Sequence, residues 1–97
     1  INHKEFVVKN RYKDFEIDVL GISEKSNLLI AGECKFENQK TSIKVLNNLL
    51  EKVKEVKWKV DDREERYFIF SKKGFKGNLI KEISQKDQIY LITIDEL

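Results

Sequence analysis

Hydrophobic and polar positions in the first third of the chain alternate between short apolar runs and short polar connections. The apolar runs cover residues 5–9, 15–22 and 28–36, and each of the two connections between them is five residues long. Runs of this length that are bounded by polar clusters predict β-strands. Because five residues are too few for a crossover, the three strands are expected to form an antiparallel meander.

Beyond Thr41 the apolar positions take the spacing of an amphipathic helix, in the order Ile43, Leu46, Leu49, Leu50, Val53 and Val56. Thr41 and Ser42 are both candidate N-caps for this helix. Strand character returns at 67–70, a shorter helical stretch covers about 78–84, and a last apolar run covers 89–94. Since a helix of this length between strands permits a parallel crossover, we predict an α/β domain with a mixed sheet.

Two of the apolar runs carry acidic residues at positions where a core strand is normally uncharged. Asp18 lies in the second run, two residues after Glu16, and Glu33 lies in the third. Successive side chains of a strand point to opposite faces, so Glu33 and Lys35 share one face while Cys34 points to the other. If the two strands are neighbours, Asp18, Glu33 and Lys35 gather in one small area.

A grouping of two acids and a lysine is chemically suited to a metal site. Two nearby carboxylates repel each other unless a cation lies between them, and their oxygens suit Mg²⁺ or Mn²⁺. A divalent ion polarises a phosphoryl oxygen and lowers the pKa of a bound water, while an ammonium orients that water or stabilises developing negative charge. These parts fit phosphodiester hydrolysis best.

The same residues resemble the signature of the PD-(D/E)xK nuclease superfamily, an acid on one core strand followed by acid-x-lysine on the next. The matching residues are Asp18 and Glu33-Cys34-Lys35. The resemblance implies a restriction-endonuclease-like fold, with a four-stranded mixed sheet flanked by helices. It also implies that Asp18, Glu33 and the backbone carbonyl of Cys34 bind the metal, and that Lys35 is the catalytic lysine.

A narrower resemblance rests on the residues around this signature. The stretches 16–19 and 32–36 look most like the nuclease-like domain at the C-terminal end of archaeal and bacterial AAA-type ATPases. They are also similar to archaeal junction resolvases. The resemblance implies that an ATPase domain, in the same chain or in a partner chain, is associated with this one.

Basic residues follow the strands that carry the acids. Lys40 and Lys44 are four residues apart near the end of the Glu33 strand, and Lys72 and Lys73 lie in the loop after the fourth strand. A phosphate backbone approaching the metal would pass these positions. We expect the four lysines to contact DNA without reading its bases. A solvated outer face in a lysine-rich protein is the alternative interpretation.

Ordinary explanations also exist for the acids. Asp18, Glu33 and Lys35 are compatible with a half-exposed strand face that carries solvated charges or a surface salt bridge. The acidic run 61–65 imitates a metal-binding cluster, but such runs are typical of an exposed loop or helix end.

Composition sets limits without naming a function. The 97 residues suit a single domain, and 37% charged with 40% apolar residues indicate a globular chain with a net charge of +2. Cys34, as the single cysteine, excludes an internal disulfide and predicts a reduced, cytoplasmic setting. No apolar run approaches the about 18 residues that predict a membrane span. Because the chain begins with Ile1, we expect it to be a piece of a longer protein.

Together these features predict a Mg²⁺-dependent deoxyribonuclease-like domain that hydrolyses DNA phosphodiester bonds, with DNA favoured by the resemblance alone. The alternative is a catalytically inactive binding or regulatory module of the same fold, attached to an ATPase. This alternative stays open because many superfamily members use a further acid from a helix before the first strand, which these 97 residues do not supply. Cutting two strands usually takes two active sites, so a homodimer is also expected.

Overall fold

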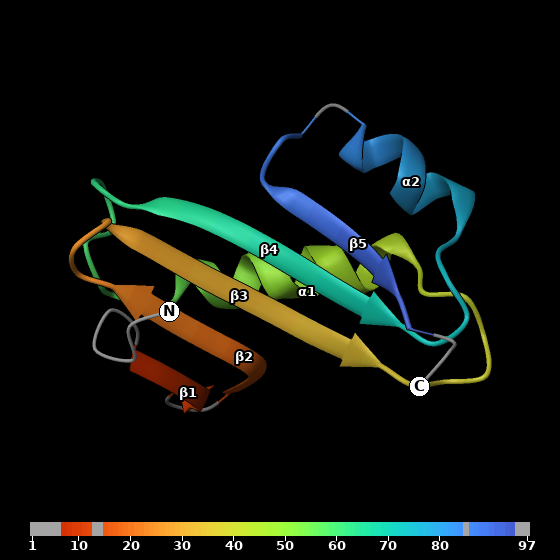
Figure 1. Cartoon of the computed structure of the whole chain (residues 1–97), viewed down its shortest axis with the longest axis horizontal. Helices are drawn as coiled ribbons and strands as arrows, with labels where there is room; N and C mark the ends of the chain where they lie inside the picture. The colour runs from red at the N-terminus through yellow and green to blue at the C-terminus, as the bar shows by residue number, and fades with distance from the viewer. Residues whose placement is uncertain (1–6, 13–14, 85, 95–97) are drawn as a thin grey trace.

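The computed structural model describes residues 7–12, 15–84 and 86–94 (Figure 1). Within them, strands and helices follow one another in the predicted order: β1 (Val7–Tyr12), β2 (Phe15–Ser23), β3 (Leu28–Lys35), α1 (Ile43–Lys54), β4 (Glu64–Ser71), α2 (Gly77–Ile83) and β5 (Ile89–Thr93). The bounds of β2, β3, α2 and β5 lie within one residue of the predicted ones. The first strand was expected from residue 5, and residues 5 and 6 lie outside the described part.

All the described strands belong to one mixed sheet with the order β1-β2-β3-β4-β5. β1, β2 and β3 pair antiparallel, whereas β4 and β5 add in parallel, each after a helix. The predicted meander and the parallel crossover are therefore confirmed. The described sheet has five strands, as the apolar runs indicated, rather than the four that the family resemblance implied. The last strand, β5, follows α2 and pairs with the outer edge of β4.

The long helix α1 begins where the sequence predicted. Ser42 is the N-cap, and its side chain accepts a hydrogen bond from the Lys44 backbone N–H at 3.3 Å. Leu46, Leu49 and Val53 form the buried stripe of the helix. This stripe packs on the sheet. Burial of each aliphatic side chain contributes about 2 kcal/mol to stability, and this holds the helix in place.

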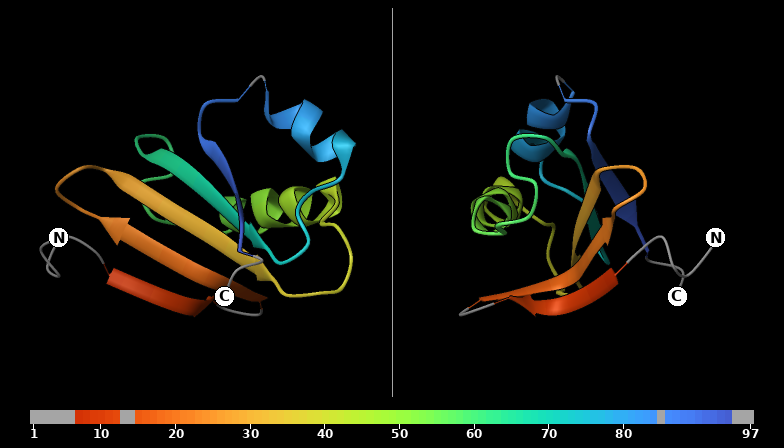
Figure 2. Two further views of the ribbon diagram at one scale, coloured as in Figure 1. Left: turned by 45° about the vertical axis from the view of Figure 1, so that its right-hand side comes forward. Right: turned by 90° about the vertical axis from the view of Figure 1, so that its left-hand side faces the viewer.

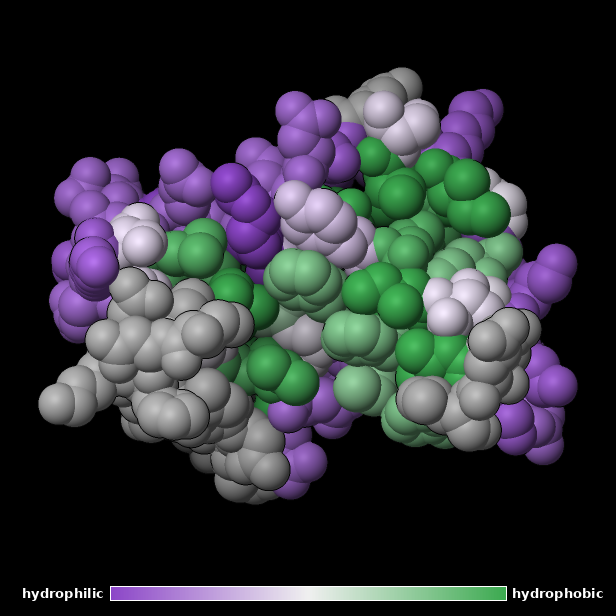
Figure 3. Space-filling model, viewed as in Figure 1, coloured by the Kyte–Doolittle hydropathy of each residue, from purple (hydrophilic) through white to green (hydrophobic). Residues whose placement is uncertain are grey.

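The two helices pack on the same face of the sheet, and the right-hand view of Figure 2 shows them together on one side. The core lies between them and the strands, and its buried members include Leu20, Leu29, Ala31, Leu46, Leu49, Val53, Tyr67, Ile69, Leu79 and Ile89. On the opposite face, Phe68 and Tyr90 stack with their ring centroids 4.9 Å apart. Figure 3 shows apolar side chains gathered across the strands on that face. None of the helices in the described ranges has the length and apolar character needed to cross a membrane.

β4 begins at Glu64, three residues before the predicted start at Tyr67. The Glu64 backbone N–H donates to the Asn27 carbonyl at 2.8 Å, so pairing with β3 begins directly after the β2–β3 turn. The first residues of β4 are polar, so a search for apolar runs predicted too late a start for the strand. Backbone pairing with an established neighbour, rather than side-chain polarity, sets this boundary.

The C-terminal end of α1 is held by Arg63, whose side chain is only 2% exposed. Its guanidinium donates to the carbonyls of Val53 at 3.0 Å, Val56 at 2.7 Å and Trp58 at 2.6 Å. Its Nε donates to Glu65 Oε2 at 2.8 Å. These bonds satisfy carbonyl groups at and after the helix end and place a positive charge at the negative end of the helix dipole.

Candidate metal and nucleic-acid site

The candidate site lies where the pairing of β2 with β3 ends. The regular register runs from Ser23 opposite Leu28 to Val19 opposite Gly32. Beyond it, the Cys34 backbone N–H donates to Asp18 Oδ2 at 2.8 Å. A carboxylate of β2 therefore accepts a hydrogen bond from the backbone of β3. This contact brings Asp18 beside the Glu33-Cys34-Lys35 segment.

Asp18 lies in an irregular segment of β2. The pairing of β1 with β2 changes register opposite residues 16–20. Within that segment Ile17 and Leu20 are buried whereas Asp18 is exposed, so burial does not follow a simple two-residue alternation. Register shifts of this kind turn side chains at the ends of sheets and next to functional sites. Here the shift accompanies an acid that turns toward the neighbouring strand.

Glu33 is the buried acid of the site. It lies on β3 opposite Ile69 of β4 and is only 6% exposed. Burial raises the pKa of its carboxyl above the ordinary value of 4.5, and a hydrogen-bond contact with Asp18 raises this pKa further. The charge of Lys52 acts in the opposite direction, because its Nζ lies 3.3 Å from Glu33 Oε1. Two acids and an ammonium therefore share one small region.

Cys34 presents its backbone, rather than a reactive thiol, to this region. The N–H and C=O of one strand residue point to the same side, and those of the next residue point to the other. The Lys35 carbonyl accepts from the Lys72 N–H of the β4 side at 2.9 Å, so the Cys34 carbonyl points toward β2 and Asp18. Burial raises the pKa of the Cys34 thiol, and the charges of Asp18 and Glu33 raise it further. At neutral pH the thiol stays protonated and is a poor metal ligand.

Lys35 is half-buried at the end of β3, in register with Ser71. Strand alternation places it on the same face as Glu33. Among the described residues, no three His, Cys, Asp or Glu side chains gather closely enough to hold a metal ion. The acidic run 61–65 is thus not such a cluster. The donor set at the candidate site is two carboxylates and a carbonyl, and oxygen donors are what Mg²⁺ and Mn²⁺ prefer.

The loops that follow β3 and β4 leave the same edge of the sheet and are tied together. Thr41 Oγ1 donates to Ser71 Oγ at 2.8 Å, and Ser71 Oγ donates to the Gly74 carbonyl at 2.8 Å. The Thr41 N–H also donates to the Gly74 carbonyl at 2.9 Å, and Gly74 has a φ of +85°, which favours glycine. Thr41 and Ser71 are both buried, so the two loops form one surface.

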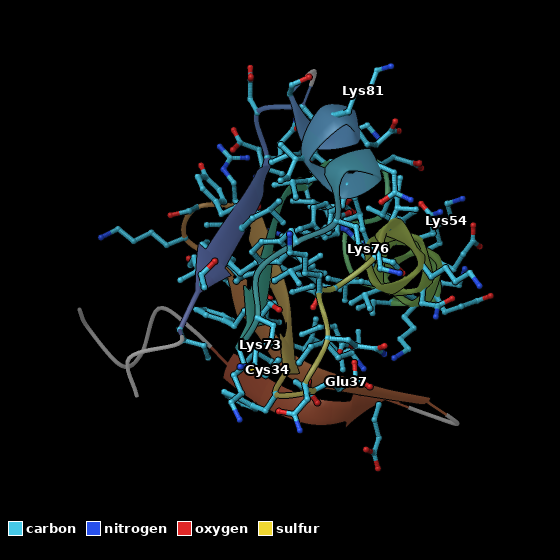
Figure 4. All side chains as sticks on the ribbon, turned by 90° about the vertical axis from the view of Figure 1, so that its right-hand side faces the viewer. Cys34, Glu37, Lys54, Lys73, Lys76 and Lys81 are labelled. Atoms are coloured by element: carbon cyan, nitrogen blue, oxygen red, sulfur yellow. The ribbon has the colours of Figure 1, made fainter. Side chains whose placement is uncertain are left out.

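This pair of loops carries the predicted DNA-contacting lysines. Lys40, Lys72 and Lys73 are exposed on the two loops, and Lys44 is exposed in the first turn of α1. Lys72 Nζ donates to Asn38 Oδ1 of the other loop at 3.4 Å. Figure 4 looks onto this edge of the molecule, with Cys34 at the end of β3 and Lys73 after β4 labelled. The structure therefore places the basic segments at the edge where the strand with Glu33 ends.

Lys52 is the residue of this region that the sequence did not single out. Val45 lies four residues before Leu49, and Leu49 lies three residues before Lys52, so the three share one stripe of the helix. A lysine interrupting an apolar stripe is the signal that identifies such a residue.

Comparison with known proteins gives a likeness of fold. No family model matches this chain, and no curated protein matches it. Among solved structures, the crystal structure of a repair endonuclease from Pyrococcus abyssi is similar, with a TM-score of 0.58 and 11% identity over 92% of this chain. This chain spans 37% of that protein's length. The likeness confirms the predicted α/β fold class, a mixed sheet with helices of the kind found in a repair endonuclease.

Proposed function

We propose that this chain is a Mg²⁺- or Mn²⁺-dependent deoxyribonuclease domain. The observation that carries the proposal is the meeting of Asp18 with the Glu33-Cys34 segment at the point where the β2–β3 pairing ends. Two carboxyl groups held this close, one of them buried, favour a cation between them. The likeness of fold to a repair endonuclease adds support from an independent direction.

Each residue of the site has a distinct part in this proposal. Asp18, Glu33 and the Cys34 carbonyl would hold the ion, which supplies Lewis-acid polarisation of the phosphate and a more acidic bound water. Lys35 places a positive charge on the Glu33 face of β3, where it orients the attacking water and stabilises the charge that develops on the phosphate. Burial around Glu33 keeps these interactions strong by limiting water.

The tied loops are the proposed contact surface for DNA. The exposed residues Lys40, Lys44, Lys72 and Lys73 would neutralise backbone phosphates without reading bases. Each phosphate contact contributes a slope of about −0.9 to the dependence of log affinity on log salt concentration for duplex DNA. Replacing both Lys72 and Lys73 by Ala is expected to reduce that slope by about 2.

A second candidate function is an inactive nuclease-fold module that binds or regulates a partner, with an attached or associated ATPase domain as the partner that the sequence suggests. The observation in its favour is the ion pair of Lys52 with Glu33, which balances the charge of Glu33 without a metal ion. A cytoplasmic location and a homodimer stay predictions of the sequence under either function.

The test is cleavage of supercoiled plasmid and of branched DNA by the purified protein with Mg²⁺ or Mn²⁺. Asp18→Asn is expected to reduce cleavage at least about 100-fold, because it removes a charged ligand of the ion that would stabilise the transition-state charge. Asp62→Asn, which changes an exposed acid in the connection between α1 and β4, is the matched control and is expected to cleave like wild type. Cleavage by wild type that Asp18→Asn leaves unchanged would refute the site. Absence of cleavage by the wild-type protein would favour the binding module.

A further inference from the structure

The two carboxylates of the candidate site are each held by one contact from a different direction. Asp18 Oδ2 accepts the Cys34 N–H of β3 at 2.8 Å, and Glu33 Oε1 accepts from Lys52 Nζ of α1 at 3.3 Å. In each carboxylate, these contacts engage one of the two oxygens. Asp18 also raises the pKa of Glu33, as a neighbouring acid does.

Lys52 reaches Glu33 because of its place on the helix. Its neighbours Leu49 and Val53 are almost completely buried, so the packing of α1 on the sheet determines where the Lys52 stem starts. The Lys52 side chain is 32% exposed and the Glu33 side chain is 8% exposed, so the contact lies at the rim of the core. A lysine at this position crosses apolar surface with its methylene groups and delivers its charge to a fixed point.

We propose that Lys52 is a positioning residue of the metal site, which holds Glu33 by one oxygen and thereby directs the other toward the cation shared with Asp18. This role rests on the proposed metal-dependent function. A glutamate has three side-chain torsions, and repulsion from Asp18 would otherwise turn its carboxylate away. Partners that orient a ligating carboxylate typically change metal affinity by about 10- to 100-fold when they are removed.

A competing role makes the opposite prediction. If Lys52 only neutralises Glu33 in the absence of metal, its ammonium competes with the cation, and removing it strengthens cation binding. If Lys52 positions Glu33, removing it weakens binding despite the loss of a positive charge. The sign of the change in affinity therefore distinguishes the two roles.

The experiment is calorimetric titration of the purified protein with Mn²⁺ alone, without DNA. Lys52→Met is expected to bind Mn²⁺ about tenfold more weakly than wild type. Lys52→Arg, which retains a charged donor, is expected to recover most of the affinity. Lys54→Met is the matched control, since Lys54 is exposed in the same helical turn and pairs with Glu51 rather than with the site, and it is expected to bind like wild type.

Equal or tighter Mn²⁺ binding by Lys52→Met would overturn the positioning role and leave the proposed function intact. Failure of the wild-type protein to bind Mn²⁺ would overturn the proposed function and this role with it. Circular dichroism and thermal unfolding establish that each variant is folded. If Lys52→Met does not fold, Lys52→Gln provides the same test with a polar side chain, and the same two results decide it.

Discussion

Two pairs of opposite charges, Arg63–Glu65 and Lys52–Glu33, lie near the C-terminal part of α1, and they differ in how completely they are matched. At the end of α1, Arg63 donates to three carbonyls and to Glu65, while the Tyr67 hydroxyl donates to the other oxygen of Glu65. At the end of β3, Glu33 accepts from Lys52 but also faces a second acid. In the first group each charge has a matching partner, whereas the second group brings two acids together.

This difference separates a structural charge from a functional one. A buried ion pair whose polar atoms are all matched stabilises a local conformation, here the exit from α1 into β4. Two acids placed against each other cost stability in the absence of a cation, so such an arrangement is typical of sites that bind or react. We therefore assign the Arg63 network to the fold and propose that the Asp18–Glu33 pair serves function.

Removing Arg63 is expected to have the largest effect on stability. Arg63→Met should lower the free energy of unfolding by about 3–5 kcal/mol, because it leaves Glu65 and several carbonyls without their donor. Urea unfolding measures this change, with Arg66→Met as the control because Arg66 is less buried and pairs with exposed Glu64. A loss below about 1 kcal/mol would show that the network is not structural and would remove one side of the comparison.

Neutralising the acid of each pair is expected to give opposite results. Glu65→Gln should lower the free energy of unfolding by about 1–2 kcal/mol, since Arg63 loses its charged partner. Glu33→Gln should leave the metal-free protein as stable as wild type, or more stable by up to about 1 kcal/mol, since it removes repulsion from Asp18. Chemical unfolding in the presence of a chelator compares them. A larger loss for Glu33→Gln than for Glu65→Gln would reverse the assignment.

The smallest expected effect is a pH dependence with a defined sign. The raised pKa of Glu33 means that the folded protein holds this proton more tightly than the unfolded chain does. Its contribution to stability is full below pH 4.5 and is lost as the pH rises through the raised folded-state pKa. Without divalent cations, wild type should thus lose stability relative to Glu33→Gln over that window. A difference between the two proteins that is constant with pH, or that grows in favour of wild type, would contradict the raised pKa.

Local patterns in the sequence predicted the elements and their order, and a strand register explains why Asp18 and Glu33 meet. The apolar runs and the short connections determine a meander, and a meander necessarily brings β2 beside β3. The register shift in β2 was not predictable, because it depends on pairing with β1 rather than on the residues of β2 alone. The contact of Cys34 N–H with Asp18 lies in the segment of β2 where that irregularity occurs.

Contacts between segments distant in sequence account for what the sequence missed. Lys52 and Glu33 are 19 residues apart, and only the packing of α1 on the sheet brings them together. Arg63 lies in a charged run that is typical of an exposed loop, yet three carbonyls near the end of α1 surround it. The Thr41–Ser71 hydrogen bond, which joins the two basic loops, likewise spans 30 residues.

The most direct test of the account is a crystal structure of the protein soaked in Mn²⁺ and measured at a wavelength that reveals the ion by anomalous scattering. We predict one ion ligated by Asp18, Glu33 and the Cys34 carbonyl, with oxygen distances of about 2.1–2.2 Å. Lys52 should remain in contact with Glu33 in that structure. Absence of anomalous density between Asp18 and Glu33 at a saturating Mn²⁺ concentration would contradict the assignment of this pair as a metal site.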